Sequence, residues 1–233
     1  MRRLIVSTCI VASACAFASP ARSADLPLNG PQQAFTVSEF LSGWYLRGDV
    51  GYSFFADPGG ALANNSFTSS SIGNTGSVDL GIGYQAGWLR GDVTASYAFR
   101  PKFIGNTAAA SPDVAARMDA ITTLFNGYFD FSPWHGFTPY IGAGLGFSVL
   151  RPSQFTTVSV PATVTAAIPS RFDFAWDVTA GASYALSRSW LIDTSYRYIH
   201  VGNPSGVLNN LGTVDFGDMS AHELRAGLRY LID

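Results

Sequence analysis

The sequence has almost no cysteine and a single lysine. Both cysteines, Cys9 and Cys15, fall within the first 15 residues. If that segment is removed, the remaining chain has no disulfide framework, no redox motif and no thiol nucleophile. Lys102 is the only lysine, and 14 basic residues stand against 16 acidic ones. This balance lacks the basic patch of a nucleic-acid binder, so we expect no nucleic-acid partner.

Long apolar runs are also missing beyond the N-terminus. Two arginines open residues 1–23, an apolar stretch covers Leu4–Ala18, and Ala21 and Ser23 form an A-x-S cleavage site. These features predict a cleaved signal peptide over 1–23 and export from the cytoplasm. Lipidation at Cys15 is the alternative, and it is disfavoured because no large aliphatic residue lies just before that cysteine. No later stretch approaches the 18 apolar residues that a spanning helix needs.

Residues 24–42 are predicted to be a periplasmic linker. They contain Pro27, Gly30 and Pro31 and are too short to form a second domain. Residues 43–233 are predicted to form the barrel domain.

Apolar and polar side chains alternate along the rest of the chain. In Val78–Trp88 every second residue is apolar, and the residues between are Asp79, Gln85 and glycines. Alternate side chains of a strand point to opposite faces, so this pattern predicts a strand with one apolar face. The same pattern predicts eight strands, near 43–55, 77–88, 91–101, 117–131, 139–150, 171–186, 190–200 and 219–232. Leu124 is an exception, because it falls on the polar face of its strand.

The predicted connections are alternately long and short. The long ones, near 56–76, 102–116, 151–170 and 201–218, are rich in small and polar residues; the short ones lie near 89–90, 132–138 and 187–189. Short periplasmic turns and long extracellular loops are typical of bacterial outer-membrane barrels. The predicted fold is therefore all-β: an eight-stranded antiparallel up-and-down transmembrane β-barrel with four long extracellular loops.

Glycine indicates which face points inward. The soluble alternative, a lipocalin-like barrel, would turn its apolar face inward and leave the polar face in water. Here the polar face carries many glycines, at positions 51, 81, 83, 87, 142, 144, 146, 181 and 227. Glycine weakens a strand and therefore often marks a place where other atoms approach the backbone closely. The narrow interior of a small barrel is such a place. We therefore expect the polar face to line the lumen.

The charged residues of the polar face are the candidate lumen network. They are Arg47, Asp49, Asp79, Asp92, Asp173, Asp177, Asp193, Arg197, Glu223, Arg225 and Arg229. An eight-stranded barrel is filled by its own side chains, and buried charges must be paired. We expect a structural plug of ion pairs, with Glu223 and Asp49 as partners of the arginines on the first and last strands. A gated ion or proton path is the alternative.

Two further sets of residues are expected at the membrane surfaces. An aromatic belt at the short-turn end would contain Trp44, Trp88, Trp134, Trp190 and Tyr230, with Trp176 as the exception. Cations near the long loops could contact lipopolysaccharide phosphates, since arginine suits phosphate recognition; they are Arg100, Lys102, Arg117, Arg151 and Arg171. A solvated rim of loop charges is the alternative for this second set.

Several runs resemble the alphaproteobacterial, rhizobial-type outer-membrane β-barrel family, related to opacity proteins and the barrel of outer-membrane protein A. The carrying runs are Ala-Asp-Leu-Pro at 24–27, Gly-Trp-Tyr-Leu-Arg-Gly-Asp-Val-Gly-Tyr at 43–52, Asn-Gly-Tyr-Phe-Asp-Phe at 126–131, Thr-Pro-Tyr-Ile-Gly-Ala-Gly-Leu-Gly at 138–146, Ala-Gly-Ala-Ser-Tyr-Ala-Leu at 180–186, Asp-Thr-Ser-Tyr-Arg-Tyr-Ile at 193–199 and Glu-Leu-Arg-Ala-Gly-Leu-Arg-Tyr at 223–230. The resemblance implies a barrel in the outer membrane with surface-exposed loops. It also implies the barrel assembly machinery as a partner. Such barrels commonly end in an aromatic residue, whereas this chain ends Tyr230-Leu231-Ile232-Asp233.

The expected function is structural. We predict a non-enzymatic barrel, without cofactor or metal, that contributes to envelope integrity and contacts a host or surface ligand through its loops. A narrow solute channel and a haem-binding or adhesin receptor are the alternatives. A lipid A deacylase is disfavoured because His200 lacks a serine two residues on, and because adjacent His222 and Glu223 face opposite ways on a strand.

Overall fold

The computed structural model describes residues 42–62, 65–66, 68–106, 114–157, 171–203, 205–208, 212–215 and 217–232. The predicted signal peptide, 1–23, and the predicted linker up to residue 41 lie outside the described residues. No helix long and apolar enough to cross a membrane occurs in the described ranges.

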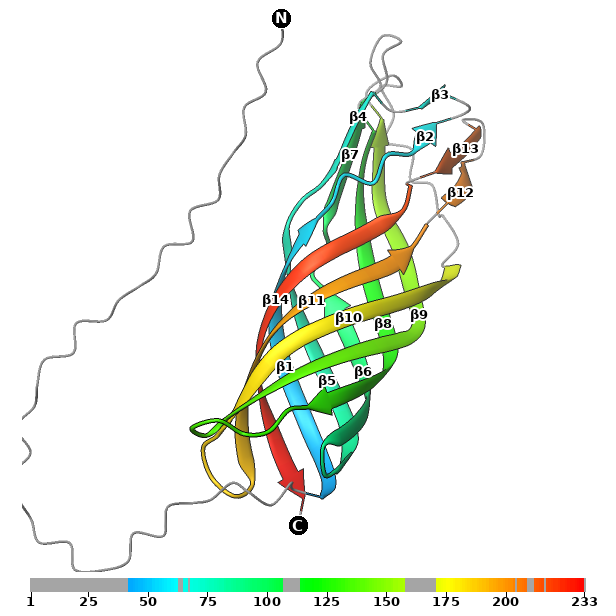
Figure 1. Ribbon diagram of the computed structural model, residues 1–233. Coiled ribbons are helices and arrows are strands. Elements are labelled where there is room, and N and C mark those ends of the chain that lie inside the picture. Colours follow the sequence, from blue (N-terminus) through cyan, green and yellow to red (C-terminus); the bar gives the residue numbers. More distant parts are fainter. Residues whose placement is uncertain are drawn as a thin grey trace, which may run out of the picture. The chain divides into compact units, whose positions relative to one another are not determined.

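Eight long strands form the main sheet (Figure 1). They are β1 (Gly43–Phe55), β5 (Thr75–Ala86), β6 (Leu89–Ala98), β8 (Val114–Asp130), β9 (Phe137–Thr157), β10 (Arg171–Ala185), β11 (Trp190–Gly202) and β14 (Met219–Ile232). Each pairs antiparallel with the next long strand along the chain. Because β14 also pairs antiparallel with β1, the sheet closes into a barrel. The predicted fold class is confirmed.

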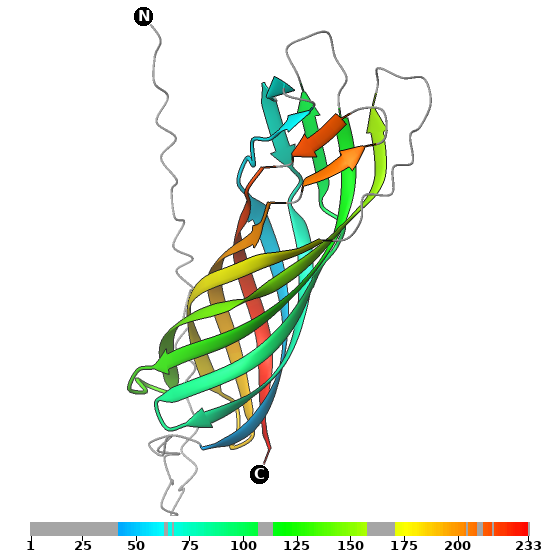
Figure 2. The same ribbon diagram turned by 90° about the vertical axis from the view of Figure 1, so that its right-hand side faces the viewer.

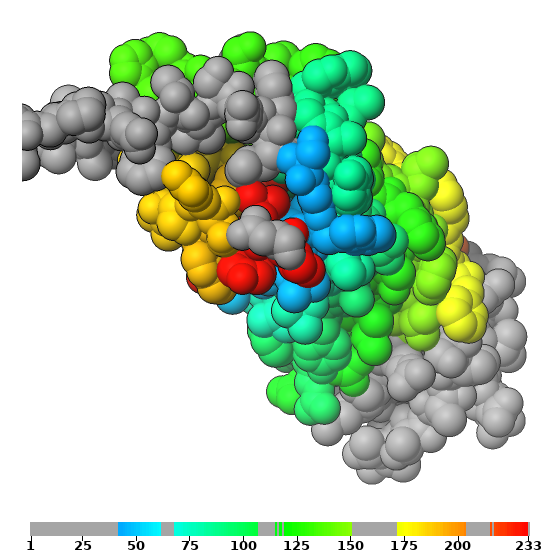
Figure 3. Space-filling model, turned by 90° about the horizontal axis from the view of Figure 1, so that it is seen from below, coloured from blue at the N-terminus to red at the C-terminus, as the bar shows by residue number. Residues whose placement is uncertain are grey.

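The seam of the barrel joins the two ends of the described chain. β1 and β14 pair from Trp44 opposite Ile232 to Phe55 opposite Ala221. Seen from the end where β14 finishes, the first residues of β1 lie directly beside the last residues of β14 (Figure 3). This pairing leaves no free edge along the seam.

The long connections contain strands that the sequence pattern missed. They are β2 (Ala61–Leu62), β3 (Asn65–Ser66), β4 (Ser69–Ile72), β7 (Lys102–Asn106), β12 (Ser205–Leu208) and β13 (Gly212–Asp215). β4 and β7 extend the main sheet beside β8, while β12, β13, β2 and β3 form a second, four-stranded sheet. Figure 2 shows both groups at the end of the barrel opposite the C-terminal strand end. These strands are short and rich in small residues, so they carry no readable alternation.

The outer surface of the barrel is apolar and the interior is polar. On β1 the side chains of Trp44, Leu46 and Val50 are exposed, whereas Arg47 and Asp49 between them are buried. On β5 Leu80 is 71% exposed, and its neighbour Asp79 is 1% exposed. A soluble lipocalin-like barrel would show the opposite arrangement, so the inward direction predicted for the polar face is correct.

One part of the interior departs from that prediction, because its upper layer is apolar. The inward side chains nearest the long connections form one buried cluster: Ile72, Phe103, Ala120, Leu124, Leu150, Ala175, Ile199, Val201, Met219 and Ala221. Leu124, the exception in the sequence pattern, is fully buried in this layer. The interior is thus charged in its middle and apolar near its extracellular end.

Candidate functional site: the barrel interior and its outer rim

The polar interior brings together almost all of the charged residues that the alternation selected. Of the eleven candidates, all but Asp173 are buried, and Asp173 is half-buried. They reach the interior because each occupies the inward phase of its strand. The ten buried residues are Arg47, Asp49, Asp79, Asp92, Asp177, Asp193, Arg197, Glu223, Arg225 and Arg229.

Arg47 connects two carboxylates in the interior. Its Nε donates to Asp49 Oδ2 at 2.8 Å, and its Nη1 donates to Asp92 Oδ2 at 3.1 Å. The same Nη1 donates to the Tyr128 hydroxyl at 3.0 Å, and the Tyr45 hydroxyl donates to Asp92 Oδ2 at 2.9 Å. Arg47 and Asp92 lie on β1 and β6, which are not neighbours in the sheet, so this pair crosses the interior.

Glu223 and Arg197 form the centre of the network. Arg197 Nε donates to Glu223 Oε2 at 2.7 Å, and the guanidinium also lies 3.6 Å from Asp79 Oδ1 and 3.9 Å from Asp177 Oδ2. Glu223 Oε1 accepts hydrogen bonds from Ser53 and from Ser77. One guanidinium therefore faces three carboxylates.

The arginines of the last strand have different partners from those expected. Arg229 Nε donates to Asp193 Oδ2 at 3.1 Å, and Arg225 Nη1 lies 3.8 Å from Asp79 Oδ2. The expectation that Glu223 pairs with these arginines is wrong, because Glu223 pairs with Arg197 of β11. Arg197 stands directly opposite Glu223 where β11 pairs with β14, and this register across a long connection cannot be derived from the sequence.

Sequence reasoning missed a further buried pair, Arg90 and Asp130. Arg90 Nη2 donates to Asp130 Oδ1 at 3.0 Å, and Gln85 Nε2 donates to Asp130 Oδ2 at 3.1 Å. The guanidinium also lies over the rings of Tyr128 and Tyr140, 4.3 Å and 4.6 Å from their centroids, in cation–π geometry. The sequence does contain a signal for the buried position of Arg90, because Arg90 lies two residues before Asp92 and points to the same face of the strand.

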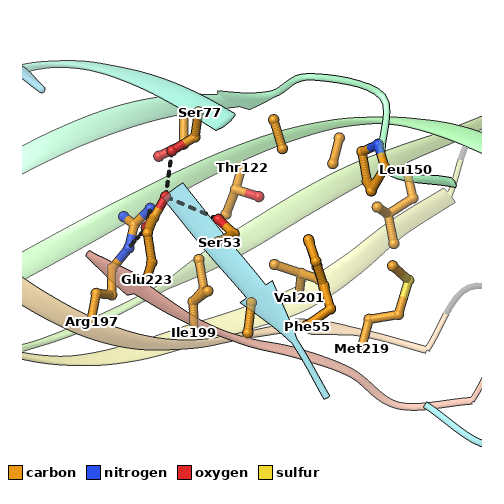
Figure 4. A pocket seen from close by; sticks show the side chains of 15 residues that line it. Ser53, Phe55, Ser77, Thr122, Leu150, Arg197, Ile199, Val201, Met219 and Glu223 are labelled. Carbon is orange, nitrogen blue, oxygen red and sulfur yellow. Dashed lines mark hydrogen bonds and ion pairs between the residues drawn. The ribbon is translucent and has the colours of Figure 1, made fainter. Parts of the chain in front are cut away.

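Apolar side chains close the interior at both ends. Tyr45, Leu191 and Leu231 form a buried cluster at the short-turn end, and the apolar layer described above lies at the other end. A cavity of about 40 Å³ lies where the ionic centre meets that upper layer (Figure 4). Glu223, Arg197, Ser53 and Ser77 stand at one end of it, and Phe55, Leu150, Val201 and Met219 at the other. A space of this size holds a few water molecules at most.

The outer face carries the predicted belt residues at the short-turn end. Trp44, Trp88, Trp134, Trp190 and Tyr230 are all exposed there. The rings of Trp44 and Tyr84 lie 5.5 Å apart, and those of Trp190 and Tyr230 lie 4.9 Å apart.

A second aromatic group lies on the outer face nearer the long connections. Trp176 stacks on His200 with ring centroids 6.0 Å apart and contacts Tyr198 at 5.6 Å. His222, on the next strand, packs on Tyr198 and shares a hydrogen bond with the Tyr196 hydroxyl at 2.5 Å. Amphipathic rings favour both surfaces of a membrane, and the position of Trp176 is consistent with the second surface.

The predicted phosphate-contacting cations lie on the outer rim, as far as their side chains are described. Arg100, Lys102 and Arg117 are exposed, and Arg100 Nε donates to Asp119 Oδ1 at 3.1 Å. Lys102 of β7 stands directly opposite Arg117 of β8. The side chains of Arg151 and Arg171 lie outside the described part of the structure.

The histidines do not form a catalytic or metal-binding cluster within the described residues. His222 is exposed on the outer face, whereas Glu223 is buried in the interior. His135 lies in the turn between β8 and β9, with a backbone φ of 51°. The described ranges contain no group of three or more histidine, cysteine or acidic residues that could hold a metal ion.

Fold and interior together define the class of this protein. A closed barrel of eight antiparallel strands with an apolar outer surface and a charged interior is a transmembrane β-barrel of the outer-membrane type. Residues 9–230 match the family model of the outer membrane protein beta-barrel domain, and the chain belongs to this family. It is therefore a protein of the cell outer membrane.

The relatives come from several bacteria. The chain is 29% identical to an uncharacterised protein of Brucella suis, over 91% of this chain and 93% of that protein. It is 28% identical to a candidate adhesin of Rickettsia bellii, over 80% of this chain and 87% of that protein. The structure resembles the outer membrane protein OprG of Pseudomonas aeruginosa with a TM-score of 0.54 at 12% identity, covering 83% of this chain and 97% of that one. This last likeness concerns the fold alone.

Proposed function

We propose that this protein is a non-catalytic barrel with a sealed interior, which contributes to envelope integrity and presents its long connections to the surroundings. The filling of the interior carries this proposal. Buried ion pairs occupy the middle of the barrel, and apolar clusters lie above and below them. A filled interior offers no route for a solute, which disfavours the alternative of a narrow channel.

The strands beyond the barrel support a role in surface contact. β2 in the first long connection pairs with β13 in the last one, at Val214 opposite Leu62 and Asp215 opposite Ala61. A sheet holds a loop surface in a defined shape and lowers the entropy lost on binding a partner. The similarity to a candidate adhesin of Rickettsia bellii supports a surface that binds a host or matrix protein.

This surface can be tested by display on cells. The protein is expressed in the outer membrane of a non-adherent bacterium, and residues 57–66 are replaced by a short glycine-serine linker. The replacement is expected to abolish adherence to host cells or matrix proteins. The same linker inserted in the short turn 187–189 is the control and is expected to leave adherence unchanged. Heat-modifiable gel migration shows that each variant folds. Adherence equal to that of the empty strain in the wild type contradicts the proposal.

A second role is favoured by the cations on the outer rim. Arg100, Lys102 and Arg117 lie just beyond the exposed apolar side chains of Phe99 and Ile121. Lipid A phosphates occupy this level of an outer membrane, and arginine binds phosphate with two donors at once. We infer that these residues contact lipopolysaccharide. Tyr230, exposed on the last strand, is the candidate signal for the barrel assembly machinery.

A further inference from the structure

The interior of the barrel contains more buried acids than buried bases. Among the described residues, the buried acids are Asp49, Asp79, Asp92, Asp130, Asp177, Asp193 and Glu223, and the buried bases are Arg47, Arg90, Arg197, Arg225 and Arg229. Two negative charges are therefore left over inside a structure that is surrounded by lipid. An uncompensated charge in such a place is costly, so a proton or a counter-charge must neutralise it.

The shortage of positive charge is greatest around Asp177, because Asp79 also lies 3.8 Å from Arg225 Nη1. Both share the Arg197 guanidinium with Glu223, which takes the short hydrogen bond, so the other two ion pairs are 3.6 Å and 3.9 Å long. Neither oxygen of Asp79 accepts a hydrogen bond, and Asp177 Oδ1 accepts none either. Asp79 is 1% exposed and Asp177 is 3% exposed, so bulk water does not satisfy these oxygens.

Asn126 adds a fourth unpaired oxygen beside Asp177. Its Nδ2 donates to Asp92 Oδ1 at 2.8 Å and to Thr94 Oγ1 at 3.0 Å. These two acceptors determine the orientation of the amide, so the Oδ1 atom must point the other way. Asn126 is 7% exposed, and its Oδ1 has no hydrogen-bond partner.

Gly144 is the residue against which these two oxygens converge. A Cβ atom at position 144 would lie 2.6 Å from Asp177 Oδ1 and would collide with Asn126 Oδ1. The two unpaired oxygens, one from β10 and one from β8, therefore approach the same point on β9, which lies between those strands. Only glycine lets both oxygens come this close to the β9 backbone and to each other.

We propose that the converging oxygens of Asp177 and Asn126 bind a small monovalent cation, such as Na⁺. A cation satisfies both oxygens and supplies positive charge where Arg197 is shared among three acids. One carboxylate and one amide oxygen, completed by water, suit a singly charged ion. A divalent ion prefers several carboxylates, and the described residues contain no such cluster.

The test compares salts at the same ionic strength. The refolded protein is heated in detergent micelles with sodium chloride or with N-methyl-D-glucamine chloride, whose cation is too large to enter. The unfolding midpoint of the wild type is expected to be about 3–6 °C higher in sodium at ten times the dissociation constant. Asp177→Asn is expected to lose this difference. Asp173→Asn, on the same face of β10 but half-buried, is expected to keep it.

Sodium-23 NMR of the wild type tests binding without any variant. Line broadening that saturates with protein, and that Li⁺ or K⁺ reverses, supports the site. Equal unfolding midpoints in the two salts and an unbroadened sodium line overturn it. An infrared carboxylic-acid band that Asp177→Asn removes also overturns it, because Asp177 then carries a proton in place of a cation.

Discussion

Arg90 on β6 and Asp130 on β8 form an ion pair 3.0 Å long inside the barrel, and both side chains are buried. The Arg90 guanidinium is also covered by two tyrosine rings. Breaking such a pair leaves an isolated buried charge, whereas removing both charges does not.

The first prediction follows from this pair. Arg90→Leu is expected to lower the free energy of unfolding by about 3–5 kcal/mol, because Asp130 is left without its cation. Arg90→Leu combined with Asp130→Leu is expected to recover most of that loss. Urea unfolding in lipid vesicles, followed by tryptophan fluorescence, measures both. A double variant less stable than the single one would refute the explanation.

The second prediction concerns the apolar outer face. Leu80, near the middle of β5, is 71% exposed, and Leu186, at the short-turn end, is 55% exposed. Leu80→Arg is expected to cost about 2–4 kcal/mol because a charge enters the bilayer core, and Leu186→Arg about 0–1 kcal/mol. The same unfolding assay compares the two variants. Equal costs would show that these positions do not differ in membrane depth.

The third prediction uses two glycines that face opposite ways. A Cβ at position 146 would lie 3.0 Å from Leu124 Cα and would collide with the Thr123 carbonyl oxygen, while a Cβ at position 127 meets nothing within 4 Å. Backbone atoms cannot move aside, so Gly146→Ala is expected to reduce the yield of folded barrel strongly. Gly127→Ala is expected to change stability by no more than about 0.5 kcal/mol. Heat-modifiable gel migration gives the folded fraction of each.

The fourth prediction concerns the rim cations. Lys102→Gln combined with Arg117→Gln is expected to lower the amount of lipopolysaccharide that co-purifies with the protein, because two positive charges of the rim are lost. Arg188→Gln is the matched control, since Arg188 is exposed in the short turn between β10 and β11. If the double variant retains as much lipopolysaccharide as the control, the rim is a solvated surface.

The fifth prediction concerns conductance. The wild-type protein in planar bilayers is expected to show no steady current of porin size, because charged and apolar layers fill its interior. Single-channel recording over a range of voltages is the measurement. Stable openings of porin size would favour the channel alternative over the sealed barrel.

Most of the barrel was readable from the sequence because alternation reports the two faces directly. The period of two placed Arg47, Asp79 and Glu223 inside and Leu80 outside, as observed. The strand ends were predicted less accurately than the faces. Arg90, for example, was assigned to a turn although it belongs to β6. The apolar upper layer was missed although Phe55 and Ile199 share the phase of the polar residues Ser53 and Arg197, since the interior was expected to stay polar throughout.

The pairing of charges was beyond the reach of the sequence. Arg47 of β1 contacts Asp92 of β6 across the interior, between strands that are not neighbours. Such contacts depend on strand tilt and stagger, which are properties of the closed barrel. The short strands of the long connections were missed for another reason, because segments of two to five residues carry too little periodicity to be recognised.

The seam between β1 and β14 has a consequence for how this protein assembles. Its twelve paired positions join residues 43–55 to residues 219–232, which are separated by the whole of the intervening barrel sequence. Contacts between such distant segments form slowly, because the intervening chain must be ordered first. Until the last strand has been delivered, the first strand exposes an unpaired edge that invites aggregation. Closure of the barrel therefore depends on the segment of the chain that is synthesised last.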